Sequence, residues 1–227
     1  MHFAVPIFPG SNCDRDTIHA IEDVLDQPVT AVWHQDSDLK KFDAIIIPGG
    51  FSYGDYLRTG ALAAQSPIME GIREAADQGK LVLGICNGFQ ILLETGLLPG
   101  AMRRNDHLQF RCSISRLSVE NTQTPFTLGF SQGEQIRIPI AHIEGNYYCD
   151  EETLQELQQK GQIIFRYAGE NPNGSIDYIA GICNERRNVL GMMPHPERAI
   201  FDWMGSTDGV KLFTSMLQYW KENNGAA

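Results

Sequence analysis

The strongest structural signal in this chain is the stretch Leu81-Val82-Leu83-Gly84-Ile85-Cys86-Asn87-Gly88-Phe89-Gln90. Its first five residues form a short apolar run, which predicts a buried strand. After Asn87, large apolar residues recur at helical spacing, which predicts a helix. Between the two lies Gly-x-Cys-x-Gly, the pattern of a nucleophile elbow with cysteine in place of serine. We therefore predict a tight turn from strand to helix at Cys86.

The rest of the first half of the chain also alternates strands with helices. Apolar runs predict strands at residues 3–8, 29–33 and 42–47. Helical spacing predicts helices at residues 18–25, after a start at Ser11 and Asp14, and at residues 68–75. Such an alternation is typical of a parallel sheet with helices on both faces, and ligands of these sheets bind beyond the carboxyl ends of the strands. The turns to consider are therefore residues 9–12, 48–54 and 84–88.

The second half of the chain has strand patterns without helices between them. We predict strands at residues 110–119, 126–130, 135–140, 178–183 and 189–193, with a hairpin loop at residues 184–188. One helix is predicted at residues 151–159, and Asp208 is predicted to cap a final helix. The expected architecture is a three-layer α/β/α domain with a mostly parallel central sheet and an antiparallel elaboration in the second half.

Composition and charge narrow the class of protein. The chain has 227 residues, of which 42% are hydrophobic and 20% charged, and its net charge of -10 argues against nucleic acid or an anionic membrane surface as a partner. Its five cysteines have no C-x-x-C spacing, which indicates free thiols in a reducing compartment. No basic leader and no apolar run near 18 residues occurs, so we expect a cytoplasmic protein. The sequence also lacks a phosphate loop, a dinucleotide fingerprint and H-E-x-x-H, so we predict no nucleotide or metal site here.

Cys86 is the candidate nucleophile. A tight turn holds the thiol outward in a strained backbone, and Gly84 and Gly88 lack the Cβ atoms that would clash on either side. The helix that follows directs its positive end at the thiol, and the N–H of Asn87 is free to face an oxyanion. The alternative is a buried structural cysteine beside two helix-packing glycines. Cys13 also opens a helix after a turn, so its pKa is expected to be low and it is the competing thiol.

The best-placed histidine for activating a thiol is His195, in the run Met-Pro-His-Pro-Glu-Arg. Pro196 disfavours helical backbone at His195, and in an extended segment residues two apart point to the same side. Glu197 can then orient the imidazole as the third member of a triad. A rigid proline-braced loop with a surface ion pair is the alternative. His142, followed two residues later by Glu144, is the second choice for the base.

The turn Pro48-Gly49-Gly50-Phe51 ends the strand predicted at residues 42–47. Its glycines allow backbone amides to approach a ligand closely, which would supply a second oxyanion donor. An ordinary glycine-rich turn between a strand and a helix has the same sequence, so this turn does not distinguish the two interpretations by itself.

Together these motifs resemble the class I (triad) glutamine amidotransferases. The resemblance lies in residues 84–90, in the Pro48-Gly49-Gly50 turn and in Pro194-His195-Pro196-Glu197. It implies a flavodoxin-like three-layer fold, a single amidotransferase domain over residues 1–227 and a glutamyl thioester on a triad of Cys86, His195 and Glu197. It also implies that Gln90 contacts bound glutamine, and that the substrate and oxyanion site includes Gly49, Gly50, Phe51 and Asn87.

Longer motifs resemble, within that family, the glutaminase subunits that serve an ATP-dependent ligase of purine biosynthesis. These motifs are residues 8–14, 51–58, 171–175 and 189–199. The resemblance implies that this chain hydrolyses L-glutamine and supplies ammonia to a large synthetase subunit, with a small bridging subunit in the same complex. ATP and Mg²⁺ are expected on the synthetase subunit, and no cofactor or metal on this chain. One departure is Ile143, where the family pattern has glycine after the histidine.

Two other functions fit part of the same pattern. A cysteine hydrolase of the DJ-1/PfpI group would share the scaffold and the elbow cysteine, but it would not need Gln90 or the Pro-His-Pro-Glu segment. A regulatory or assembly subunit with an inert triad would also keep the fold. A substrate screen distinguishes the hydrolase from a glutaminase. Loss of glutamine-dependent turnover on Cys86→Ala distinguishes the inert subunit from a glutaminase.

Overall fold

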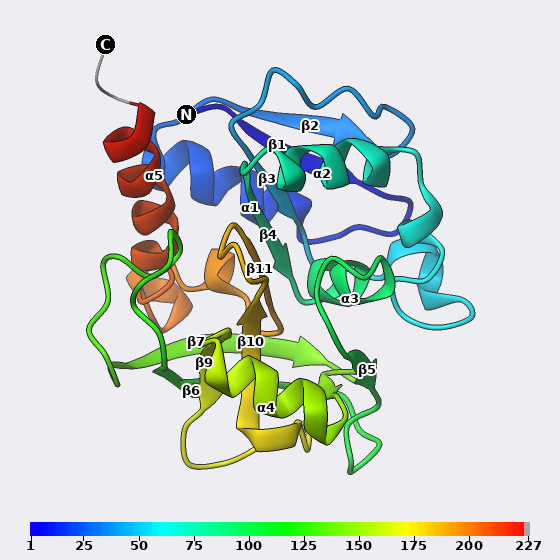
Figure 1. Cartoon of the computed structure of the whole chain (residues 1–227), viewed down its shortest axis with the longest axis vertical. Coiled ribbons are helices and arrows are strands. Elements are labelled where there is room, and N and C mark those ends of the chain that lie inside the picture. The colour runs from blue at the N-terminus through cyan, green and yellow to red at the C-terminus, as the bar shows by residue number, and fades with distance from the viewer. Residues whose placement is uncertain (225–227) are drawn as a thin grey trace.

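The computed structural model describes residues 1–224 and is built around a mixed nine-stranded sheet (Figure 1). The strand order is β2-β1-β3-β4-β11-β10-β9-β6-β7. The strands are β1 (Phe3–Ile7), β2 (Val29–Trp33), β3 (Ala44–Ile47), β4 (Leu81–Ile85), β6 (Arg111–Val119), β7 (Gln135–His142), β9 (Ile163–Tyr167), β10 (Ile179–Cys183) and β11 (Val189–Met192). The first five strands in this order are parallel and the remaining neighbours are antiparallel. The predicted parallel sheet with an antiparallel elaboration is confirmed.

Helices cover both faces of the parallel strands. The helices are α1 (Asp14–His19), continued by a π-helical turn at Ala20–Val24, α2 (Ile68–Asp77), α3 (Asn87–Glu94), α4 (Glu151–Gln159) and α5 (Val210–Asn224), and of these α4 lies over the antiparallel part of the sheet. In Figure 1, α2 and α3 lie on one side of these strands and α1 and α5 on the other. Within residues 1–224, none of the helices has both the length and the apolar character that crossing a membrane requires.

The helix α2 shows why these elements pack as they do. Its buried residues include Ile68, Ile72 and Ala76, which share one face at helical spacing, while Glu70 and Arg73 point outward. Burying each of the isoleucine side chains contributes about 1.5–3 kcal/mol. The strands that α2 and α3 cover are themselves apolar over their whole length, as expected for parallel strands with helices on both faces.

The antiparallel part of the sheet brings a distant segment to the carboxyl end of β4. β10 and β11 form the predicted hairpin, and the long pair β6 and β7 places His142 opposite Arg111. A separate two-stranded sheet, β5 (Ala101–Arg103) with β8 (Asn146–Tyr148), fastens the chain that follows β7. The loop at residues 141–145 therefore lies beside the end of β4.

Three neighbouring strands end together and so bring the predicted site residues to one place. β3 is followed by Gly49 and Gly50, β4 by Cys86, and β11 by the segment that contains His195. Their registers pair Ile47 with Gly84 and Met192 with Ile85. The turn after β1 joins them, because the N–H of Cys13 donates to Gly49 O at 3.3 Å.

Three local predictions are wrong. Residues 126–130 do not form a strand; a chain of turns begins at Thr124, whose hydroxyl bonds to that of Thr127 at 2.6 Å. α1 begins at Asp14 with Cys13 as its N-cap, because the hydroxyl of Ser11 accepts from Phe8 N–H instead. The carboxylate of Asp208 likewise accepts from Arg137 N–H, two residues before α5 begins.

Candidate active site

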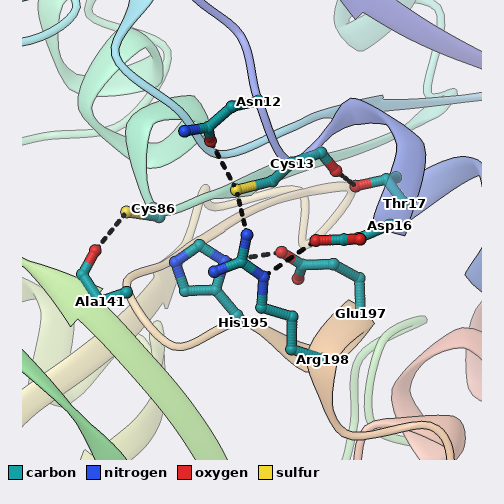
Figure 2. Close-up of polar contacts among 9 residues, drawn as sticks. All are labelled: Asn12, Cys13, Asp16, Thr17, Cys86, Ala141, His195, Glu197 and Arg198. Carbon is teal, nitrogen blue, oxygen red and sulfur yellow. Dashed lines mark hydrogen bonds and ion pairs between the residues drawn. The ribbon is translucent and has the colours of Figure 1, made fainter.

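Cys86 lies at the turn between β4 and α3 and has an unusual backbone conformation. Its φ is 51° and its ψ is -105°, a region that costs a non-glycine residue about 1–3 kcal/mol. The turn is held by Cys86 N–H donating to Met192 O at 2.8 Å and by Gln90 N–H donating to Cys86 O at 3.1 Å. The Sγ atom lies 3.8 Å from the carbonyl oxygen of Ala141 (Figure 2). A strained cysteine held between a strand and a helix has the geometry of a nucleophile elbow.

The two glycines of the elbow are required by close packing. A Cβ at Gly84 would lie 2.5 Å from Leu92 Cδ1 and 2.7 Å from Gly88 O. A Cβ at Gly88 would overlap the backbone carbonyl of Ile47. The glycines therefore allow α3 to begin directly against β3 and β4, which is what turns the chain so sharply at Cys86.

His195 and Glu197 form a buried pair. The Nδ1 atom of His195 lies 2.6 Å from Glu197 Oε1, and the two residues are only 1% and 0% exposed. His195 has a ψ of 88°, outside the helical region as expected before a proline. The following residues form a short 3₁₀ turn, Pro196–Arg198, and not the expected extended segment. This turn brings Glu197 to the imidazole, and the burial of the pair contradicts the alternative of a surface ion pair.

The charges around His195 favour its protonated form. Burial acts to lower the pKa of His195, but the negative charge of Glu197 and the neighbouring Cys86 raise it further, so the pKa lies well above its usual value. The thiol of Cys86 and the imidazole are neighbours, because both line the larger cavity at this end of the sheet. Among the described residues, His195 Nε2 has no hydrogen-bond partner. This nitrogen is therefore free to exchange a proton with Cys86.

Cys13, the competing thiol, lies at the same site. Arg198 Nη2 donates to Cys13 Sγ at 3.1 Å, and the thiol also bonds to Asn12 Oδ1 at 3.1 Å (Figure 2). Burial raises the pKa of Cys13 and outweighs the lowering effect of His195 and Arg198, so the expected low pKa is wrong. Its contact with Arg198 joins residues 185 positions apart, and no spacing in the sequence could have indicated it.

The structure separates the predicted oxyanion donors into two groups. The N–H of Phe51 is taken up, because it donates to Gly10 O at 3.0 Å. Within residues 1–224, the N–H groups of Gly50 and Asn87 have no backbone acceptor. Gly49 has another role, since a Cβ there would lie 2.8 Å from His195 Cε1 and 3.2 Å from Cys13 Sγ. Gly50 and Asn87 are thus the better candidates for holding an oxyanion at Cys86.

Gln90 and Asn87 belong to a hydrogen-bond network beside Cys86. Asn87 Nδ2 donates to Gln90 Oε1 at 2.9 Å, and Gln90 Nε2 donates to Glu144 O at 2.6 Å. Asn87 Oδ1 also accepts from Ser52 N–H at 3.1 Å, which fixes the loop after Gly50. The side chains of the elbow helix therefore tie together the loops of residues 50–55 and 141–145.

His142, the second choice for the base, lacks an orienting carboxylate. Glu144 bonds to Thr59 Oγ1 at 3.0 Å and to Arg104 Nε at 3.4 Å, not to the imidazole. Burial, followed by the charge of His195, lowers the pKa of His142 to about 4. The geometry therefore favours His195 over His142 as the base.

Two cavities meet at Cys86. The larger has a volume of about 280 Å³ and is lined by Asn12, Cys13, Gly50, Phe51, Cys86, Phe110, Ala141, His195 and Arg198. The smaller has a volume of about 20 Å³ and is lined by Gly50, Phe51, Asp55, Thr59, Cys86, Gln90, Ala141, His142, Ile143 and Glu144. Another cavity of about 300 Å³, beside β6, contains none of the predicted site residues. Ile143, the departure from the family pattern, lies in the wall of the smaller cavity.

Metal-ligand atoms also come together in this cluster. Cys13, His195 and Glu197 place one ligand-type atom each within 4.8 Å of one another. However, His195 and Glu197 bond to each other, and the guanidinium of Arg198 bonds to the thiol of Cys13. A cation already occupies one face of the cluster, so these side chains fit a hydrogen-bonded charge network better than a metal centre.

With this fold and this site, the chain belongs to the CobB/CobQ-like glutamine amidotransferase family, whose model matches residues 1–220. It is therefore an amidotransferase enzyme, as the Cys86 and His195 motifs predict. The family also decides against the alternative of a DJ-1/PfpI-like hydrolase.

Among solved structures, the chain is similar to PurLQS from Thermotoga maritima, with 48% sequence identity, a TM-score of 0.89 and coverage of 97% of this chain and 99% of that one. More distant structures share the fold alone. One is a putative GMP synthase protein from Thermoplasma acidophilum, with 14% identity, a TM-score of 0.66 and coverage of 100% and 98%. Another is a glutamine amidotransferase from Thermotoga maritima, with 13% identity, a TM-score of 0.60 and coverage of 98% and 83%.

Proposed function

We propose that this chain is the glutaminase subunit of phosphoribosylformylglycinamidine synthase, in the de novo biosynthesis of purines (IMP). It hydrolyses L-glutamine to glutamate and supplies the ammonia for the ATP-dependent conversion of formylglycinamide ribonucleotide to formylglycinamidine ribonucleotide. The observation that carries this proposal is a strained cysteine beside a buried His195–Glu197 pair, in a chain that is 48% identical to a PurLQS chain over nearly its whole length.

The proposed chemistry begins at Cys86. His195 Nε2 takes the thiol proton, and the thiolate attacks the side-chain amide carbon of glutamine. The N–H groups of Gly50 and Asn87 hold the oxyanion, and His195 then gives its proton to the departing ammonia. In the second half of the reaction, His195 takes a proton from water, which hydrolyses the glutamyl thioester and releases glutamate. Glu197 keeps the imidazole oriented throughout.

The partners follow from the same resemblance. A large synthetase subunit would bind ATP and Mg²⁺ together with the ribonucleotide, and a small subunit would bridge it to this chain. The acidic charge of this chain does not suit nucleic acid, and we place the complex in the cytoplasm. Residues 1–227 would act as one glutamine amidotransferase domain, without a cofactor or metal of its own.

The proposal can be tested with the complex of this chain and its synthetase partners. In the wild-type complex, both glutamine and free ammonia should support formation of the amidine product. Cys86→Ala should abolish the glutamine-dependent reaction and leave the ammonia-dependent reaction intact. If Cys86→Ala keeps near-normal glutamine-dependent turnover, the proposed nucleophile is wrong. If the wild-type complex uses ammonia but never glutamine, the chain is an inert assembly protein.

A further inference from the structure

The thiol of Cys13 has no part in the proposed reaction, although it lies in the active site. It lines the larger cavity together with Cys86 and His195. Its sulfur, a ring nitrogen of His195 and a carboxylate oxygen of Glu197 all lie within 4.8 Å of one another. The cavity has a volume of about 280 Å³, many times what one water-sized molecule needs, so a small oxidant fits beside both cysteines.

Gly49 lies between the two cysteines and leaves the space there open. A Cβ at Gly49 would lie 3.2 Å from Cys13 Sγ and 3.4 Å from Cys86 Cβ, so both side chains border the position that a Gly49 side chain would fill. The N–H of Cys13 donates to Gly49 O at 3.3 Å, which fastens the turn of Cys13 to the turn after β3. In Figure 2 no labelled side chain is drawn between the two sulfur atoms. Rotation about the two Cα–Cβ bonds would therefore bring the sulfurs toward each other.

The neighbours of Cys13 suit a thiol that reacts second. Arg198 Nη2 donates to Cys13 Sγ at 3.1 Å, and the guanidinium charge would stabilise a thiolate once it forms. Burial nevertheless raises the pKa of Cys13, so this group stays a protonated thiol in the resting site. In the proposed mechanism Cys86 gives its proton to His195 and is the thiolate. Because peroxides react with thiolates, Cys86 is the thiol that is oxidised first.

We propose that Cys13 is a site of oxidative modification, which forms a disulfide with Cys86 when a peroxide oxidises the nucleophile. The Cys86 thiolate attacks one peroxide oxygen and breaks the O–O bond, while protonated His195 gives its proton to the departing hydroxide. This step leaves a sulfenic acid on Cys86 and one water. His195 then takes the proton of Cys13, whose sulfur attacks the Cys86 sulfur. The displaced hydroxide receives that proton and leaves as a second water, so two thiols lose two electrons and hydrogen peroxide gains them.

The disulfide would switch off the glutaminase reversibly and protect its nucleophile. A sulfenic acid without a second thiol goes on to sulfinic and sulfonic acids, which thiol reductants do not reverse. A disulfide between Cys13 and Cys86 stops at the first stage, and a dithiol reductant restores both thiols. This inference goes beyond the proposed function and uses it only to name Cys86 as the thiolate.

The test exposes the complete complex to excess hydrogen peroxide and then treats half of each sample with dithiothreitol. Glutamine-dependent product formation is measured relative to the ammonia-dependent rate of the same sample, so that damage to the synthetase is not counted. Peptide-resolved mass spectrometry without reduction identifies linked and oxidised cysteines. The variants are Cys13→Ser and, as a matched control, Cys112→Ser, which removes an exposed thiol outside both cavities.

The wild-type complex should lose glutamine-dependent activity by at least about tenfold and regain more than about half of it with dithiothreitol, since a disulfide is reducible. It should also yield a peptide that links Cys13 to Cys86. Cys13→Ser should lose activity in peroxide and regain less than about a tenth, with a sulfinic or sulfonic acid on Cys86. Cys112→Ser should behave as the wild type.

Three results would overturn the inference. The first is an inactivated wild-type complex without the linked peptide, and this measurement does not depend on the folding of either variant. The second is a Cys13→Ser complex that recovers as fully as the wild type. The third is a loss of recovery in Cys112→Ser, which would make Cys112 the second thiol. A complex that does not use glutamine even before peroxide would instead count against the proposed function, because the linked peptide is detected without turnover.

Discussion

Two turns of this protein begin a helix at a buried cysteine, and both cysteines line a cavity together with His195. At Cys13 the backbone is ordinary, with φ -101° and ψ 8°, and the thiol bonds to the guanidinium of Arg198. At Cys86 the backbone is strained, with φ 51° and ψ -105°, and the nearest polar atom bonded to the thiol is Ala141 O at 3.8 Å. Only the second thiol faces both cavities.

On the proposed assignment, proximity to an imidazole does not by itself make a thiol the nucleophile. Cys13 is held by Asn12 and Arg198 on one side of the imidazole, and burial raises its pKa. Cys86 is turned outward by the close approach of α3 to β3 and β4, where two free backbone N–H groups can receive an oxyanion. Backbone strain and nearby oxyanion donors distinguish Cys86 from Cys13 better than the neighbours of each thiol do.

The largest expected effect separates the two thiols directly. Cys86→Ala should reduce glutamine hydrolysis by at least about 10⁴-fold, because it removes the proposed nucleophile. Cys13→Ala should leave the rate within about tenfold, since Glu197 still orients His195. Steady-state ammonia release from the assembled complex measures both. Equal losses from the two changes would mean that the thiols act as one unit and that the comparison is wrong.

A smaller loss is expected when the imidazole loses its carboxylate. Glu197→Gln should reduce kcat, but by roughly 50- to 100-fold less than Cys86→Ala does, because the carboxylate is the least costly member of a triad to remove. The pKa of His195 should also fall, because the charge of Glu197 is what raises it most against burial. The rate of Cys86 alkylation, measured as a function of pH, reports the pKa values of the Cys86 thiol and the His195 imidazole. An unchanged profile in the variant would contradict the assigned role of Glu197.

The next prediction concerns the glycines two residues before and after Cys86, because the residues at the same distance from Cys13 are Ser11 and Arg15. Gly88→Ala should destabilise the protein by about 1–3 kcal/mol, because the new Cβ overlaps the carbonyl of Ile47. Gly129→Ala is the matched control, since its Cβ would meet only Ser215 Oγ at 3.2 Å and Lys211 O at 3.7 Å. Urea unfolding of both variants tests this. A harmless Gly88→Ala would mean that α3 can move away from β3.

The smallest expected effect lies in the smaller cavity, onto which the Cys86 turn opens. Asp55 has a native pKa of about 6, above its ordinary value of 3.8, so the native state holds this proton more tightly than the unfolded state. Its contribution to stability is therefore present below pH 4 and is lost as the pH rises to about 6.

Asp55→Asn removes this dependence, so the variant should match the wild type near pH 4 and exceed it by roughly 1 kcal/mol at pH 7, allowing for solvent screening. Urea unfolding at the two pH values measures the difference. A variant that is less stable than the wild type at pH 7 would show that the carboxylate is favourably paired in the free protein.

The regular elements were predictable because their patterns are local. The continuous apolar run gave the bounds of β4, and the helix at residues 151–159 begins where Asp150 caps it. Residues 126–130 misled the prediction because Phe126 and Phe130 are both buried, although the chain between them is a series of turns. A short apolar run has the same pattern whether it pairs in a sheet or is buried in a series of turns, so the pattern cannot distinguish the two.

The candidate site was predictable where neighbouring residues in the sequence determine the backbone conformation of a proposed functional residue. Gly84 and Gly88 leave room for the tight turn at Cys86, and Pro196 restricts the backbone at His195. Cys13 with Arg198, and Asp55 with Glu144, meet only through the tertiary fold, so no spacing could indicate these contacts. The sequence placed Glu144 as a carboxylate for His142, and the structure instead turns it toward Thr59 and Arg104.

The most direct test of the central claim is peptide-resolved mass spectrometry after treatment with a reactive glutamine analogue, with and without excess glutamine. The complex with the synthetase partners should be used, so that the site is complete. We predict one adduct, on Cys86, that glutamine prevents from forming. An adduct on Cys13 that glutamine prevents, with Cys86 unmodified, would contradict the assignment of the nucleophile.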